Sequence, residues 1–147
     1  MERQLVEQYV AVGNVRFEYH HYIVIDGNVG GSESRRAAEA SECANEQGAF
    51  WDYHAMLFAN QQGEDSGAFS DRRLKAFAEA LQLDTGKFNT CFDSRRYVTE
   101  VQADEQRARA LGVTGTPTLF VNGRLVQNPL DFSELQSLIA ALLAASN

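Results

Sequence analysis

Residues 112–123 read Gly-Val-Thr-Gly-Thr-Pro-Thr-Leu-Phe-Val-Asn-Gly, and this stretch decides how the chain folds. Its Asn122-Gly123 pair separates two short runs of strand-forming residues, Thr118–Val121 and Arg124–Gln127. Asparagine and glycine both tolerate the positive φ that a two-residue type I′ turn needs. The stretch therefore predicts a β-hairpin, with Pro117 immediately before its first strand.

An amphipathic helix is predicted at each end of the chain. Asp131 or Ser133 caps the C-terminal helix. The N-terminal helix has no capping residue ahead of it, so we interpret these residues as starting within a helix and not at its first turn. Gly13 ends the N-terminal helix. The apolar faces contain Leu5, Val6, Tyr9 and Val10 in the first helix, and Leu135, Leu138, Ile139, Leu142 and Leu143 in the last.

A longer strand is predicted over Val15–Ile25. Apolar and polar residues alternate in its first half, and its second half is continuously apolar, which is typical of a strand covered on both faces. The Gly27–Gly31 stretch that follows lacks the pattern of a phosphate-binding loop. We interpret it as a flexible connection.

The middle of the chain is predicted to be helical. Small residues suited to close helix packing run from Ser34 until Gly48. The next segment has aromatic residues at helical spacing, which predicts a buried face, although such residues also line substrate grooves. That segment contains Phe50, Trp51, His54, Leu57 and Phe58. Ser70 is a cap for the next predicted helix, Asp84 or Thr85 is a cap for the one after it, and the last helix of this region ends at Gly112.

The composition excludes several function classes. The 147 residues have a formal charge of −7, which argues against binding to nucleic acid or to an anionic membrane surface. No apolar run reaches the roughly 18 residues of a membrane span, and no signal-peptide pattern is present in these residues. Two cysteines cannot make a disulfide framework or a four-cysteine zinc site.

The three histidines do not predict a metal site. His20 and His21 are adjacent on the predicted strand, so their side chains point to opposite faces. Adding His54 gives no recognised ligand spacing. We expect all three to be structural histidines and no metal to be bound.

Five segments together carry a family resemblance. They are residues 112–123, Ser34–Ala40, Gln47–His54, Leu57–Asn60, and the run from Leu83-Asp84 through Phe88 to Cys91. In the order in which they follow one another along the chain, and over nearly its whole length, these segments resemble the DsbA-like branch of the thioredoxin superfamily. The resemblance implies an α/β fold, a thioredoxin-like sheet with an inserted helical domain. Residues 1–31 and 112–147 would form the thioredoxin-like part and residues 32–111 the insertion.

The resemblance also implies thiol–disulfide exchange, which needs a Cys-x-x-Cys pair at a helix N-terminus. These residues contain no such pair, because Cys43 and Cys91 stand 48 positions apart. In the family the pair would precede the helix at the start of the chain and follow a strand that is also absent, so we expect the first central strand to be missing. We hypothesise that Val15–Ile25 pairs directly with Thr118–Val121, or that a second copy in a homodimer supplies a strand.

The resemblance places a substrate site at Thr116 and Pro117. A cis proline there would present the backbone of Thr116 to an extended polypeptide by strand addition. The alternative is an ordinary proline that opens an edge strand. No cofactor is implied.

Three interpretations of Cys43 and Cys91 stay open. They are a structural disulfide between two helices of the insertion, two buried thiols, and a redox pair. We favour the structural disulfide, since neither cysteine has the spacing that tunes reactivity, and such a bridge contributes on the order of 2 to 4 kcal/mol.

The sequence thus predicts a domain of a DsbA-like thiol–disulfide oxidoreductase that is catalytically incomplete as given. A non-catalytic thioredoxin-like peptide-binding module is one alternative. A glutathione-dependent isomerase relative is another, although no nucleophile or glutathione contact can be named for it. The resemblance implies a location in the periplasm or cell envelope; with no signal peptide in these residues, the cytoplasm stays open.

Overall fold

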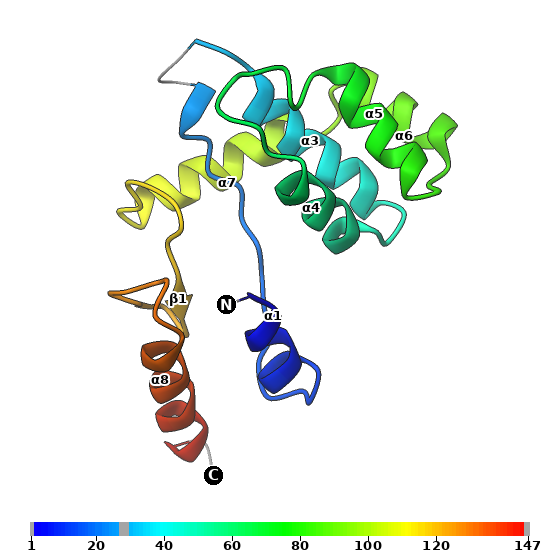
Figure 1. Ribbon diagram of the computed structural model, residues 1–147. Helices are drawn as coiled ribbons and strands as arrows, with labels where there is room; N and C mark the ends of the chain where they lie inside the picture. Colours follow the sequence, from blue (N-terminus) through cyan, green and yellow to red (C-terminus); the bar gives the residue numbers. More distant parts are fainter. Residues whose placement is uncertain (1, 27–29, 146–147) are drawn as a thin grey trace. The chain divides into compact units, whose positions relative to one another are not determined.

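The structure, a computed structural model, describes residues 2–26 and 30–145 (Figure 1). These residues divide into two compact units, Met1–His20 with Val113–Asn147, and His21–Gly112. We call them the terminal unit and the helical unit. The predicted uncapped start at Met1 and the connection over residues 27–29 lie outside the described residues. The predicted assignment of residues 32–111 to an insertion stays a prediction.

The helical unit is built around one helix, α3 (Glu33–Asn45). Four others pack against it or against one another: α4 (Phe50–Ala59), α5 (Asp71–Ala80), α6 (Thr85–Asp93) and α7 (Val98–Ala110). Ala40 and Ala44 are fully buried on α3, because their small side chains let α4, α5 and α6 approach closely. The main apolar cluster surrounds them and includes Cys43, Tyr53, Leu74, Phe77, Ala78, Phe88, Cys91 and Phe92.

Local sequence signals set the ends of several helices. The Asp84 side chain accepts a hydrogen bond of 3.0 Å from the Lys87 amide and so caps α6, as predicted. Ser70 occupies the N-cap position of α5, but its side chain makes no capping hydrogen bond. The sequence also predicts that a longer helix, which ends at Gly112, starts at Ser94 or a residue near it; in the structure this helix begins at Val98.

The terminal unit contains one hairpin and the helices at the two ends of the chain. Strands β1 (Phe120–Val121) and β2 (Arg124–Leu125) pair antiparallel, with Phe120 opposite Leu125. Asn122 and Gly123 have φ values of 47° and 77°, so the predicted type I′ geometry is confirmed. The helices are α1 (Glu2–Leu5), which continues as the π-helix η1 (Val6–Val10), and α8 (Phe132–Ala145).

The apolar cluster of the terminal unit is only partly covered. Leu5, Val126, Leu135 and Ile139 are buried. The Asp131 carboxylate accepts hydrogen bonds from the Ser133 and Glu134 amides at the start of α8, so Asp131 is the cap. Half-buried side chains complete the cluster: Tyr9, Val15, Phe17, Leu119, Val121, Phe132, Leu138 and Leu143.

The strand predicted over Val15–Ile25 is wrong. Residues 15–24 form neither helix nor strand, Ile25 is helical, and the sheet of the described residues contains only β1 and β2. The alternation read from the sequence does reflect burial, because Val15 and Phe17 join the apolar cluster while Arg16 and Glu18 are exposed. A strand, however, also needs a neighbour that supplies ladder hydrogen bonds. The direct pairing with Thr118–Val121 is therefore corrected too.

The buried aromatic face predicted for α4 is also wrong in part. Tyr53 and His54 are buried, but Trp51 is 43% exposed and Phe58 is 63% exposed. The helix buries the side that faces α3 and α5, and Tyr53 occupies that side with its hydroxyl donating to the Leu74 carbonyl at 2.8 Å.

None of the helices in residues 2–26 and 30–145 is long and apolar enough to cross a membrane.

Candidate functional site

The structure places the residues singled out by sequence in different units. Cys43 and Cys91 lie in the helical unit, and Thr116 and Pro117 lie in the terminal unit.

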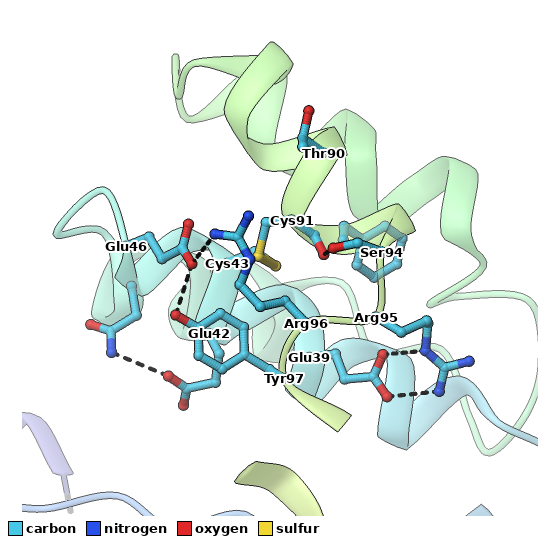
Figure 2. Close-up of a disulfide and its surroundings, with 12 residues drawn as sticks. Glu39, Glu42, Cys43, Glu46, Thr90, Cys91, Ser94, Arg95, Arg96 and Tyr97 are labelled. Atoms are coloured by element: carbon cyan, nitrogen blue, oxygen red, sulfur yellow. Dashed lines mark hydrogen bonds and ion pairs between the residues drawn. A yellow bond between two sulfur atoms is a disulfide. The ribbon is translucent and has the colours of Figure 1, made fainter. Parts of the chain in front are cut away.

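Cys43 of α3 and Cys91 of α6 form a disulfide (Figure 2). The sulfur atoms are 2.00 Å apart and the two Cα atoms 5.8 Å apart. Cys43 is 1% exposed and Cys91 0% exposed. Because these are the two cysteines of the sequence, the chain holds no thiol in this state.

Glu39, one helical turn before Cys43, is a carboxylate that is 1% exposed and held by two arginines. Arg95 donates from Nε to Glu39 Oε2 at 2.6 Å and from Nη2 to Glu39 Oε1 at 2.8 Å. Arg36 Nη1 donates to Glu39 Oε2 at 2.9 Å. A carboxylate this deep needs such partners, since an unpaired charge in the interior is strongly destabilising.

Arg36 continues this network to α5. Its guanidinium donates two hydrogen bonds to the Asp71 carboxylate, of 2.8 and 2.9 Å, and lies 3.7 Å from the centroid of the Phe92 ring. The hydrogen bond from Arg36 is the main cause of a lowered Asp71 pKa. Burial acts to lower the pKa of Arg36, but the hydrogen bonds and charges of Asp71 and Glu39 together outweigh it, so that pKa is raised.

Glu46, just under one turn after Cys43, binds the turn between α6 and α7. Arg96 Nη1 donates to Glu46 Oε1 at 2.6 Å, and the Tyr97 hydroxyl donates to the same oxygen at 2.9 Å. The hydrogen bond from Arg96 is the main cause of a lowered Glu46 pKa. Burial, with the hydrogen bond to Glu46, raises the pKa of Tyr97 to about 12.

His21 contacts acidic side chains of α3 and α7. Its Nε2 lies 2.9 Å from Glu42 Oε1, and its backbone amide donates to Asp104 Oδ2 at 3.1 Å. Burial, followed by the carboxylates of Glu42 and Asp104, raises the pKa of Glu100. Among the described residues no group of three or more His, Cys, Asp or Glu side chains is arranged to hold a metal ion.

Thr116 and Pro117 are both exposed and precede β1. The peptide bond between them is cis. The Thr118 hydroxyl donates to the Gly115 carbonyl at 2.7 Å and fixes the turn that leads into the strand. Within residues 2–26 and 30–145, neither the amide nor the carbonyl of Thr116 has a hydrogen-bond partner.

Sequence reasoning missed the ion network around the disulfide. Arg36 and Glu39 are three positions apart on one helix, a spacing from which an ion pair can be predicted. Arg95 is 56 positions from Glu39, so no local pattern could bring it there. The exposed Arg96 and the half-buried Tyr97 carried no signal for the same reason, because both bind Glu46 from about 50 positions away.

Comparison with known proteins identifies the family. A family model described as thioredoxin matches residues 1–141. The chain belongs to the DsbA-like branch of the thioredoxin superfamily. A crystal structure of oxidised BdbD from Bacillus subtilis matches this DsbA-like chain with a TM-score of 0.84 at 23% identity, covering 97% of this chain and 76% of that one, and shows the shared fold.

The DsbA-like chain also has relatives among curated sequences. Na(+)/H(+) antiporter NhaA 3 of Salinispora tropica is 33% identical over 144 residues, which are 98% of this chain and 20% of the antiporter. Disulfide bond formation protein D of Bacillus subtilis is 25% identical over 141 residues, covering 92% of this chain and 60% of that protein. The chain thus spans about a fifth of the length of the antiporters and less than two thirds of the second relative.

Proposed function

We propose that these residues are the polypeptide-binding part of a DsbA-like thiol–disulfide oxidoreductase and do not exchange disulfides themselves. The observation that carries the proposal is the exposed backbone of Thr116, which has no hydrogen-bond partner in the described part of the chain and leads directly into β1. Membership of the DsbA-like family supports it.

The Thr116 backbone can take up an extended peptide by strand addition. Its amide supplies a donor and its carbonyl an acceptor, so a peptide laid alongside gains a pair of main-chain hydrogen bonds whatever its sequence. Phe120 is 37% exposed on the strand that follows and offers an apolar contact to a peptide side chain. The expected ligand is therefore an extended polypeptide with apolar residues.

The cysteines of this chain do not supply the exchange chemistry. Exchange begins when a thiolate attacks a disulfide sulfur, so it requires an accessible sulfur with a tuned pKa. Cys43 and Cys91 are both buried within the apolar cluster of the helical unit. We therefore assign the bridge a structural role, and a location outside the cytoplasm suits it because disulfides persist in oxidising compartments.

A peptide titration tests the binding site. A ¹⁵N-labelled chain is mixed with an extended, reduced polypeptide, and amide shifts are expected at residues 115–118 and in β1. Thr116→Ala keeps the backbone groups, so its affinity should stay within about twofold of the unmodified chain, as strand addition requires. Shifts confined to the helical unit, or loss of binding in the alanine variant, would refute a backbone site at Thr116.

The alternative function, a non-catalytic peptide-binding module, would use the same site. The two functions differ in whether the full-length protein contains a catalytic cysteine pair. The oxidoreductase requires a Cys-x-x-Cys pair in the same full-length polypeptide, and the module requires none. Sequencing the natural coding region and assaying the full-length protein separates the two.

A homodimer in which one copy supplies a strand to the other is the remaining partner proposal. Sedimentation of the chain over a range of concentrations tests it.

A further inference from the structure

The turn between α6 and α7, residues 94–97, lies directly beside the disulfide in the fold. The Ser94 hydroxyl donates to the Cys91 carbonyl at 2.9 Å, and the Arg96 amide donates to the same carbonyl at 3.4 Å. The backbone of Arg95 has a positive φ of 56°, the left-handed conformation that residues other than glycine seldom adopt. The geometry of this turn is thus fixed by contacts with its surroundings rather than by backbone preference.

Both ends of this turn are held by α3 on either side of Cys43. Arg95 binds Glu39, one turn before the cysteine, with two hydrogen bonds. Arg96 and Tyr97 bind Glu46, just under one turn after the cysteine. Figure 2 shows both sets of contacts, the first at Glu39 within α3 and the second at Glu46, the residue that follows the last residue of this helix. Parting α3 from α6 near the bridge therefore requires breaking them.

We propose that the 94–97 turn is a clamp that keeps the Cys43–Cys91 disulfide closed to thiols in the folded protein. A reductant must reach a sulfur along the S–S axis, and both sulfur-bearing residues are buried. The lowest-energy route to the bridge is a local opening in which the clamp releases Glu39 and Glu46, not unfolding of the whole helical unit. The clamp thus separates this structural bridge from the exchange reactions in which the family takes part.

The reaction that reports opening is reduction by dithiothreitol. One dithiothreitol thiolate attacks a sulfur of the bridge, the S–S bond breaks, and a mixed disulfide forms with release of one cysteine thiolate. The second thiol of the reductant then displaces the other cysteine and closes a cyclic disulfide. Two electrons and two protons pass from dithiothreitol to Cys43 and Cys91.

The test compares the rate of bridge reduction with global stability. The variant Arg95→Gln with Arg96→Gln removes both ion pairs, and we expect reduction at least about tenfold faster, as measured by thiol alkylation and mass spectrometry. This acceleration should exceed the fold-change in the global unfolding constant from a denaturant titration of the same variant. Arg96→Gln alone removes an ion pair whose side chains are 49% and 29% exposed, and pairs this exposed contribute little to global stability. We expect this variant to accelerate reduction about threefold.

A matched control is an ion pair of α6 that does not involve α3. Lys75→Gln removes the Lys75–Asp93 pair of 2.7 Å, which joins α5 to α6 and makes no contact between α3 and the 94–97 turn. Reduction of this variant should change no more than its global unfolding constant. Equal acceleration in the control and clamp variants, or a clamp variant whose reduction merely follows global unfolding, would overturn the proposal.

Discussion

The two units of this chain differ in how completely they cover their apolar residues. The helical unit buries Tyr53, Leu74, Phe88 and Phe92 entirely and closes its core with a disulfide. The apolar cluster of the terminal unit contains four buried residues and eight half-buried ones, beside a hairpin of two-residue strands. Hairpins of this size are marginal without further packing. The comparison indicates that most of the stability of these residues lies in the helical unit.

Leucine truncation in each unit gives the largest contrast. Leu74 in the helical unit is 0% exposed, and Leu74→Ala should lower the free energy of unfolding by about 4 kcal/mol. Leu135→Ala in the terminal unit should cost about 2 kcal/mol, because half-covered neighbours can collapse into the space. Denaturant titration, followed separately by amide signals of each unit, measures both. Equal costs would show that the terminal core is as rigid as the helical one.

Removal of the disulfide is expected to affect one unit alone. Cys43→Ala with Cys91→Ala frees a loop of 48 residues in the unfolded chain and should lower the stability of the helical unit by about 2 to 4 kcal/mol. Fluorescence of Trp51, which lies on α4, reports unfolding of that unit. Amide exchange in β1 and α8 should not change. A matching loss of protection there would contradict the separation of the two units.

The smallest effect is on the pH dependence of the helical unit. The pKa of Asp71 is lowered in the folded state, mainly by its hydrogen bond from Arg36, so the unfolded state binds more protons between the folded pKa and the ordinary pKa of about 4. The contribution of Asp71 is therefore full above its ordinary pKa and is lost as the pH falls through the folded value. Asp71 is largely exposed, so solvent screening keeps the effect small. Unfolding titrations between about pH 2 and pH 6 should show a flatter dependence for Asp71→Asn; an unchanged slope would refute the pairing.

Local signals in the sequence were enough for many elements of both units. The Asn122-Gly123 turn and the Asp84 cap each depend on residues within a few positions, and the structure confirms both. The strand over Val15–Ile25 failed because pairing depends on a neighbouring strand, which no alternation of apolar residues can guarantee.

The candidate sites show the same difference between local sequence signals and contacts of distant segments. Thr116 and Pro117 were found through a motif of consecutive residues, and the family that this motif indicated is confirmed. The ion pairs of Arg95 and Arg96 with α3 join segments about 50 positions apart, and only the fold brings them together. The residues of the proposed peptide site could therefore be named from the sequence, whereas the contacts around the disulfide could not.

The most direct test of the account is a disulfide-exchange assay on this 147-residue chain. Insulin reduction with dithiothreitol is measured with and without the chain, and the redox state of Cys43 and Cys91 is read by alkylation at the same times. We predict no rate above the background and a bridge that stays oxidised throughout. Turnover above background that disappears in the variant Cys43→Ala with Cys91→Ala would contradict the assignment of a structural bridge and a binding role.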